Sequence, residues 1–173
     1  MGRMVLISGG NGSGKSRYAE KLVSKTTGPR HYIATMQPQT EDNFRRVKKH
    51  IAQRKGLNFT TWELPIHIDQ AEIQPNGVVL LEDVSNLLGN TIFSQAGNRE
   101  DVLGEILALR NQCSLLIAVT IGGLSSKAYQ GETAAYIEDL NSLNESLFAL
   151  ADAAATMVSG SPVWEKGNED GIF

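Results

Sequence analysis

The fold of this chain is decided by a short stretch near its start, which reads Ser8-Gly9-Gly10-Asn11-Gly12-Ser13-Gly14-Lys15-Ser16. An apolar run at 4–7 precedes it, and a helix-like segment from Ser16 to about Lys25 follows it. The pattern G-x-x-x-x-G-K-[ST] therefore lies between a strand and a helix, as a P-loop requires. Its glycines allow backbone N–H groups to turn toward phosphate oxygens, and the start of the helix adds a positive dipole.

Two side chains of this stretch have expected tasks. Lys15 reaches the β- and γ-phosphates of a nucleotide, and the Ser16 hydroxyl holds Mg²⁺, a hard cation that takes few protein oxygens when bound to a nucleotide. We therefore predict nucleotide-binding residues from Gly9 through Ser16, with a nucleoside triphosphate as ligand and Mg²⁺ as cofactor. A glycine-rich turn that contains Lys-Ser by chance is the alternative, and the complete spacing disfavours it.

Length and composition indicate one globular domain. At 173 residues the chain is long enough for one substantial core and too short for two domains of usual size. No apolar run approaches the roughly 18 residues of a membrane span, so no membrane insertion is expected. The single cysteine, Cys113, and a first strand that begins without a signal-peptide pattern indicate a cytoplasmic location. We predict one P-loop α/β domain over residues 1–173.

Basic residues are concentrated in the first third of the chain. Residues 1–55 hold twelve of the sixteen Lys and Arg against three acidic residues, although the net charge is −3. This distribution fits an anionic ligand bound by the N-terminal third. The whole chain is acidic and does not interleave basic with aromatic residues, so nucleic acid is not an expected partner.

Hydrophobic periodicity and turn residues predict the remaining elements. Strands are expected at 31–36, 58–64, 77–83, 114–120 and, as the last strand, 153–159. Helices are expected at 41–55, 86–93, 99–111 and 132–152, with a turn at Gly97-Asn98. The alternation predicts a mostly parallel sheet flanked by helices, and residues 165–173 suggest a flexible tail. The buried side of the long helix is expected to consist of Tyr136, Leu140, Leu143, Leu147 and Leu150.

The helix expected at 41–55 has an apolar and a basic side. Its apolar stripe, at helical spacing, consists of Phe44, Val47 and Ile51. Its basic side contains Arg46, His50 and Arg54 at four-residue intervals. In an isolated helix the commoner explanation of such a pattern is a solvated cationic side with an incidental histidine.

Two acidic residues, Glu82 and Asp83, end the apolar strand expected at 77–83. This is the pattern of a buried parallel strand with a carboxylate at the edge of a site. Such a carboxylate can orient Mg²⁺ and its waters, or accept hydrogen bonds from a ribose or base. Because side chains alternate along a strand, we expect only one of the two to face the nucleotide.

Several further segments match one enzyme family over nearly the whole chain. They are 9–17 with Ala19-Glu20, 32–35, 46–54 with Trp62-Glu63, 80–82 with 86–88, Asn144, Leu147, Ala151-Asp152 and 158–160. The sequence Y-I-A-T followed by R-[IV]-x-x-H-x-x-x-R is far more particular than the P-loop alone. On these segments the chain resembles the bifunctional adenosylcobinamide kinase / adenosylcobinamide-phosphate guanylyltransferase family of cobalamin biosynthesis.

The resemblance implies a nucleophile. In this family the histidine of the basic segment attacks the α-phosphate of GTP, releases pyrophosphate and becomes guanylylated, and His50 occupies its position. A neutral imidazole can attack phosphorus, and the cations beside it should lower its pKa and keep it neutral. The resemblance implies four further nucleotide-binding residues, Thr35, Arg46, Arg54 and Glu82. It favours Glu82 over Asp83 as the acidic residue of the site. Glu82 is expected to hold Mg²⁺ together with Ser16, either directly or through water.

The implied function has two steps. The aminopropanol hydroxyl of adenosylcobinamide is phosphorylated by ATP or GTP, and GMP is then transferred to give adenosylcobinamide-GDP. Lys15 and His50 are the catalytic residues in this scheme. The family implies a RecA-like P-loop fold, and its members resemble trimers, so we expect a homo-oligomer with a nucleoside triphosphate and a corrinoid as substrates.

The chain departs from the family pattern in two places. Ile121-Gly122-Gly123 stands where the family usually has Asn-Glu and a glycine-containing loop, and the usual S-G-[IL]-P ending is altered at 159–166. One alternative is therefore a nucleotide-binding homologue with reduced or lost catalysis, although such a module needs no nucleophile at position 50. The other is a different small-molecule P-loop kinase. Those enzymes usually close an arginine-bearing lid from the C-terminal half, and this chain has no arginine after Arg110.

Overall fold

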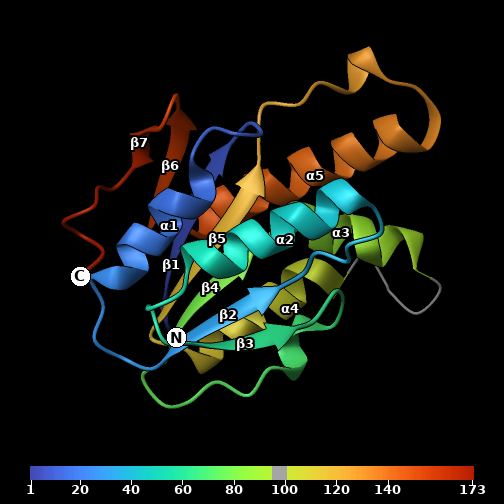
Figure 1. Cartoon of the computed structure of the whole chain (residues 1–173). Coiled ribbons are helices and arrows are strands. Elements are labelled where there is room, and N and C mark those ends of the chain that lie inside the picture. Colours follow the sequence, from blue (N-terminus) through green and yellow to red (C-terminus); the bar gives the residue numbers. More distant parts are fainter. Residues whose placement is uncertain (95–100) are drawn as a thin grey trace.

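The computed structural model describes residues 1–94 and 101–173. In this part of the chain seven strands form one sheet in the order β3-β2-β4-β5-β1-β6-β7 (Figure 1). The strands are β1 (Arg3–Gly9), β2 (Arg30–Ala34), β3 (Phe59–Glu63), β4 (Val78–Glu82), β5 (Leu115–Ile121), β6 (Ala153–Val158) and β7 (Ser161–Lys166). The helices are α1 (Lys15–Ser24), α2 (Glu41–Gln53), α3 (Val84–Phe93), α4 (Val102–Gln112) and α5 (Gly131–Leu150), with 3₁₀ turns η1 (Ile68–Gln70) and η3 (Ser126–Ala128).

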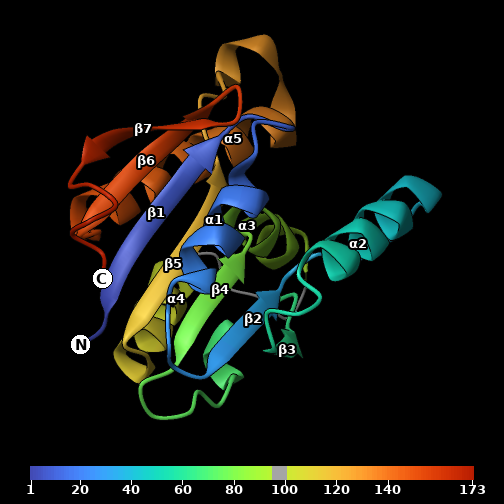
Figure 2. The ribbon, with the colours of Figure 1, turned by 60° about the vertical axis from the view of Figure 1, so that its left-hand side comes forward.

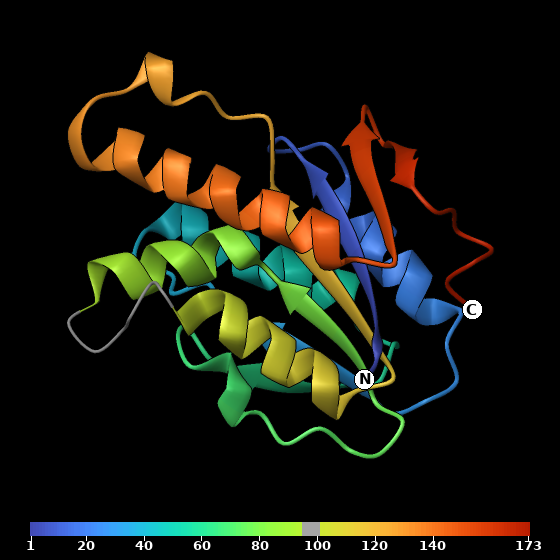
Figure 3. The ribbon, with the colours of Figure 1, turned by 180° about the vertical axis from the view of Figure 1, so that it is seen from behind.

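Helices cover both faces of the sheet. Helices α3, α4 and α5 lie on one face (Figure 3), and α1 lies on the other with α2 beside it (Figure 1). Along β1, Met4 and Leu6 pack into the core on the first face, while Val5 and Ile7 pack into the core on the second. The central strand is therefore buried on both sides, which explains its continuous apolar sequence. The predicted single α/β domain with a mostly parallel sheet is confirmed.

The strand register brings the functional segments to one edge of the sheet. Gly9 at the end of β1 is the partner of Ile121 at the end of β5, and Ala34 at the end of β2 is the partner of Glu82 at the end of β4. All four strands run parallel, so their carboxyl ends meet there. Ligands bind open α/β sheets outside this edge, and the nucleotide site is expected in the same place.

Helix α2 is attached to the sheet differently from the others. None of its thirteen residues is buried against the described part of the chain, and Phe44 and Ile51 are 54% and 51% exposed. Figure 2 shows the helix standing away from the sheet. The apolar stripe found in the sequence is thus left exposed, because α2 borders a cavity instead of lying on a core.

The C-terminal part differs from expectation in two ways. Leu150 is 42% exposed, because α5 ends there, and Ile137 belongs to the buried side instead. Strand β6 is also not the last strand. Ser159 and Gly160, with φ angles of 50° and 82°, reverse the chain into β7, which pairs antiparallel with β6. A serine in a left-handed turn gives a weaker signal than an Asn-Gly pair, so the sequence did not reveal this hairpin.

The C-terminal residues expected to form a flexible tail pack onto the domain in this structure. Glu165 and Lys166 belong to β7, and the Tyr18 hydroxyl of α1 donates to Glu169 Oε2 at 2.7 Å. Ile172 is only 5% exposed and joins the core beneath α1. One buried apolar residue and polar contacts with Tyr18, Lys25 and Arg3 therefore hold this segment on the domain.

The predicted turn at Gly97-Asn98 and the first two residues of the helix predicted at 99–111 lie outside the described residues, within which α4 begins at Val102. Among the described helices, none combines the length and apolarity needed to cross a bilayer.

Candidate active site

The P-loop borders a cavity of about 1500 Å³ at the carboxyl edge of the sheet. Gly12 and Gly14 adopt φ angles of 72° and 93°, in the left-handed region that glycine occupies without strain. Gly14 caps the N-terminus of α1, so the free N–H groups of the first helical turn adjoin the loop. Lys15 Nζ donates to the Gly10 carbonyl at 2.7 Å and thus lies over the loop, where it can contact phosphate oxygens.

Two acidic residues at the end of β4, Glu82 and Asp83, line the cavity beside the P-loop. The Ser16 hydroxyl donates to Glu82 Oε1, while Glu82 Oε2 is buried and has no hydrogen-bond partner in the described residues. Burial raises the pKa of Glu82 to about 8, an effect that the Ser16 hydrogen bond opposes and the charge of Asp83 increases. A buried carboxylate oxygen without a partner is costly, and a bound cation would satisfy it.

Asp83 also lines this cavity, so the expectation that only one of the two acids faces it is wrong. The reason is that β4 ends at Glu82, and strand alternation no longer applies to the next residue. Asp83 caps α3, since its Oδ1 accepts from Asn86 N at 2.7 Å. Its charge acts on Lys15, whose pKa is lowered by burial and raised by Asp83 and Glu82.

Helix α2 forms the opposite wall of the same cavity. Arg46, His50 and Arg54 all line it, together with Lys49. The His50 ring nitrogen Nδ1 is buried without a hydrogen-bond partner in the described part of the chain. Burial lowers the pKa of His50, and the charges of Arg46, Arg54 and Lys49 lower it further. The lowered pKa favours the neutral imidazole at neutral pH, and His50 shares its cavity with the phosphate-binding loop.

Two contacts attach α2 at its C-terminal end. Gln53 Nε2 donates to Glu20 Oε2 of α1 at 2.6 Å, and the Arg54 guanidinium lies 3.9 Å from the centre of the Tyr32 ring on β2. Glu20 is 5% exposed, and its pKa is raised by burial and lowered by Gln53. The sequence patterns predict no role for Gln53 or Tyr32. Their contacts join distant segments, so local patterns gave no signal for them.

Three predicted nucleotide-binding residues do not line the cavity: Gly9 and Thr35 are buried, and Gly10 is exposed. In the described chain its lining includes the other predicted residues but not Gly9, Gly10 or Thr35. Thr35 is fully buried, and its hydroxyl accepts from Asp83 N at 2.8 Å and approaches the Asp83 carbonyl at 2.9 Å. Thr35 therefore holds the end of β4 in place, because a short polar side chain at a strand end can bond the neighbouring backbone.

Two segments from the C-terminal half complete the wall near the P-loop. The turn after β6 contributes residues 159–162, and Gly160 N donates to the Ser13 carbonyl at 3.1 Å. Ile121 lines the cavity at the end of β5, and Gly122 N donates to the Gly9 carbonyl at 3.2 Å. The Ile121-Gly122 departure thus lies directly beside the P-loop, and it leaves an apolar side chain there.

Comparison with solved structures identifies the fold. A structure described as a prototypical ATPase from the type III secretion system of pathogenic bacteria matches 91% of this chain and 52% of its own chain, with a TM-score of 0.55 and 14% identity. At this identity the likeness concerns the fold alone, and it supports the P-loop ATPase-like arrangement of sheet and helices.

Comparison with curated proteins gives three relatives, each a bifunctional adenosylcobalamin biosynthesis protein. The CobU protein of Escherichia coli (strain K12) is 37% identical over 56% of this chain and 54% of its own length. The CobU protein of Salmonella typhimurium is 30% identical over 66% of both chains, and the CobP protein of Pseudomonas aeruginosa is 27% identical over 94% of this chain and 96% of its own. The chain thus spans about half the length of the first relative, about two thirds of the second and nearly all of the third.

A family model described as "Cobinamide kinase / cobinamide phosphate guanyltransferase" matches residues 5–164. The match runs from the first strand to β7 and includes the P-loop, the basic helix and the two carboxylates. With the relatives above, this match shows that the chain belongs to the CobU family.

Proposed function

We propose that this chain phosphorylates a cobinamide and then transfers GMP from GTP to the cobinamide phosphate through a guanylyl-histidine intermediate. The observation that supports this most directly is His50. Its neutral imidazole lies in the same cavity as Lys15 and Ser16 of the P-loop. The family and its bifunctional relatives support both activities. A P-loop alone needs no histidine nucleophile opposite it, so His50 separates this proposal from a simple kinase.

The guanylyl transfer would use His50 as nucleophile. A ring nitrogen attacks the α-phosphorus of GTP, a P–N bond forms, and the bond to the bridging oxygen breaks so that pyrophosphate leaves. A phosphate oxygen of the cobinamide phosphate then attacks the same phosphorus, which releases His50 and gives the GDP-linked product. Arg46, Lys49 and Arg54 border this path and would balance the negative charge that develops on the phosphates.

The kinase step would use the P-loop. The acceptor hydroxyl attacks the γ-phosphorus of ATP or GTP, and Lys15 holds the β- and γ-phosphates in line. The residues present fit Mg²⁺, because Glu82 Oε2 is a buried oxygen without a partner and the Ser16 hydroxyl adjoins it. Ser16 and Glu82, with Asp83 beside them, would hold the ion, which would neutralise phosphate charge.

Labelling with [α-³²P]GTP and Mg²⁺ tests the guanylyl transfer. We expect the protein to acquire an acid-labile, base-stable label that is absent from His50→Asn and absent when [γ-³²P]GTP is used. Retention of the label by His50→Asn would contradict the proposal, as would an unlabelled wild type. Nucleotide binding by His50→Asn serves as the folding control.

The kinase half is tested separately with Lys15→Ala. We expect the rate of adenosylcobinamide phosphorylation to fall by about a hundredfold or more, because phosphate-charge stabilisation is lost. If the wild type labels with GTP but phosphorylates no cobinamide, only the transferase half of the proposal stands. Ile121 beside the P-loop gives that outcome a physical reason, since the polar pair usual there is missing.

The assembly belongs to the same proposal. The resemblance implies a homotrimer with a nucleoside triphosphate and a corrinoid as its substrates. The exposed apolar stripe of α2 is compatible with a contact between subunits. Size-exclusion chromatography with light scattering gives the mass of the particle, and a monomer would contradict the trimer.

A further inference from the structure

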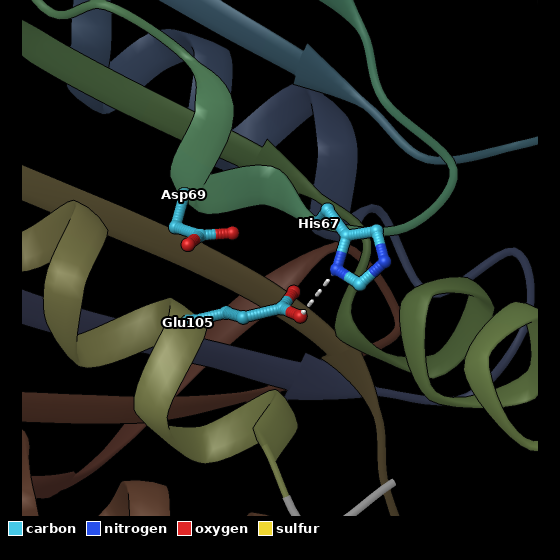
Figure 4. Close-up of side chains that lie close together, drawn as sticks. All are labelled: His67, Asp69 and Glu105. Carbon is cyan, nitrogen blue, oxygen red and sulfur yellow. Dashed lines mark hydrogen bonds and ion pairs between the residues drawn. The ribbon is translucent and has the colours of Figure 1, made fainter. Parts of the chain in front are cut away.

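Three metal-ligating side chains converge away from the nucleotide cavity. His67 and Asp69 lie at η1, in the connection between β3 and β4, and Glu105 lies on α4 (Figure 4). One ligand atom from each of them lies within 4.8 Å of the other two, and His67 Nδ1 is 3.3 Å from Glu105 Oε1. None of the three is among the residues that line the cavity described above.

The fold holds two of these ligands in fixed orientations. Glu105 is 8% exposed, and its Oε2 accepts from Ile68 N at 3.3 Å, which leaves Oε1 directed toward His67. His67 has a φ of 55°, a left-handed conformation that is uncommon for residues other than glycine. This conformation caps η1 and turns the imidazole toward α4. Asp69 follows on the same short turn and remains exposed.

The charges of the cluster favour a cation. Burial raises the pKa of Glu105, the negative charge of Asp69 raises it further, and the contacts with Ile68 N and His67 oppose the rise. Across residues 1–94 and 101–173, no Lys or Arg is recorded in an ion pair with either carboxylate. A divalent ion would balance the charges of the two carboxylates.

We propose that His67, Asp69 and Glu105 form a binding site for a divalent transition-metal ion of the zinc type. One imidazole nitrogen and two carboxylate oxygens are ligands that Zn²⁺ accepts, with water in the fourth position. The nitrogen ligand disfavours Mg²⁺ and Ca²⁺, which prefer oxygen only. Two ligands of a tetrahedral zinc ion, at bond lengths of about 2.0–2.1 Å, lie about 3.3 Å apart, and His67 Nδ1 and Glu105 Oε1 already have this separation.

The ion would join the β3–β4 connection to α4. Because imidazole and carboxylate groups bind a metal ion only when they are deprotonated, zinc affinity should fall at acidic pH. Because ligands from separate segments come together only in the folded chain, the ion would also raise thermal stability. This site is independent of the proposed catalysis, and its failure would leave that proposal unchanged.

Zinc binding by the chelator-treated protein tests the site. The titration is made against a chromophoric chelator with Mg²⁺ in excess, so that oxygen-only sites are filled. We expect about one zinc ion per chain in the wild type, and a loss of affinity of about tenfold or more in Asp69→Asn and in His67→Ala. Asp69 is exposed, so its substitution should leave the fold intact.

Two matched variants separate this site from other zinc ligands. Glu72→Gln removes an exposed acid three residues from Asp69, and His50→Asn removes the histidine of the nucleotide cavity; both should keep wild-type zinc affinity. Zinc should raise the unfolding temperature of the wild type and of both control variants, and should raise that of Asp69→Asn by less at the same zinc concentration. A wild type that binds no zinc, or Asp69→Asn and His67→Ala that bind it as tightly as the wild type, would overturn the proposal.

Discussion

Helices α1 and α2 form opposite walls of the nucleotide cavity, and the chain holds them in different ways. Helix α1 buries five of its ten residues, including Leu22 and Val23, which are fully buried. Helix α2 buries none of its thirteen residues against the described chain and is attached by Gln53 and Arg54 at one end. The phosphate-binding loop is thus built on a core, whereas the proposed nucleophile is carried by a helix with few contacts.

This difference has a consequence for the two proposed steps. The P-loop leads into a helix that is fixed by packing before a nucleotide arrives, so the first turn of α1 is preorganised for phosphate binding. The position of His50 relative to that loop depends on a hydrogen bond and a cation–π contact, which contribute on the order of 1–3 kcal/mol each. Stability should therefore be sensitive to α1, and guanylylation should be sensitive to how α2 is attached.

The largest expected effect compares two substitutions on these helices. Leu22→Ala removes a fully buried side chain and should lower the free energy of unfolding by about 2–5 kcal/mol. Ile51→Ala, at a residue that is 51% exposed, should change it by no more than about 0.5 kcal/mol. Urea unfolding at equilibrium measures both values.

Repeating that measurement at several protein concentrations provides the control. If Ile51→Ala lowers the free energy of unfolding as much as Leu22→Ala does, the apolar stripe of α2 is buried against another surface in solution. That result would contradict the prediction. A loss that grows with protein concentration would identify the cover as another copy of the chain.

The sequence predicted most accurately the strands that are buried on both faces of the sheet. Strands β1, β4 and β5 lie between two layers of helices and appear in the sequence as continuous apolar runs, so they were found within about two residues. The P-loop was found because its glycines and lysine have a fixed spacing. Strand β7 was missed because its exposed and half-buried residues alternate around a proline, Pro162, which argues against a strand in sequence.

The site was harder to predict where contacts are non-local. Arg46, His50 and Arg54 were placed on one side of a helix by periodicity, and the structure has them in one cavity with Lys15. Thr35 was assigned to the nucleotide because it ends a recognisable motif, yet its hydroxyl contacts the backbone of Asp83. Sequence spacing predicts which residues lie on the same side of a helix. It does not predict which backbone atoms a side chain at the end of a strand will contact.

The next effect tests the attachment of α2. Gln53→Ala removes the hydrogen-bond donor to Glu20 and should lower the free energy of unfolding by roughly 1–3 kcal/mol. We expect guanylylation by [α-³²P]GTP to slow by about tenfold or more, because a small displacement of a reacting group carries a large rate penalty. ATP binding at the P-loop should stay within about twofold, since α1 keeps its packing.

Lys48→Ala is the matched variant for this experiment, because Lys48 lies on α2 but is exposed and does not line the cavity. It should label at the wild-type rate. Equal slowing in Gln53→Ala and Lys48→Ala would mean that the charge or helicity of α2 matters, and that the Glu20 contact does not position His50.

The smallest expected effect is a shift in the pH dependence of labelling. Burial and the charges of Arg46, Arg54 and Lys49 lower the pKa of His50 in the folded chain. The neutral imidazole is the attacking form, so the labelling rate should be constant at neutral pH and fall as the pH drops through a midpoint below 6.5. The unfolded chain takes up this proton first on acidification, so the contribution of His50 to stability is present above about pH 6.5 and is lost as the pH falls.

Arg46→Gln removes one of the charges that act on His50 and should move the midpoint of labelling to higher pH. Arg45→Gln is its control, because Arg45 is exposed, pairs with Glu41 and Asp42, and is not among the groups that shift His50. Comparing midpoints instead of rates removes any effect of Arg46 on nucleotide affinity. If both variants keep the wild-type midpoint, burial alone sets the pKa of His50, and the cations of α2 act on the phosphates only. A wild-type midpoint close to 6.5 would contradict the expected shift and would mean that solvent reaches His50, as when α2 moves away from the cavity in solution.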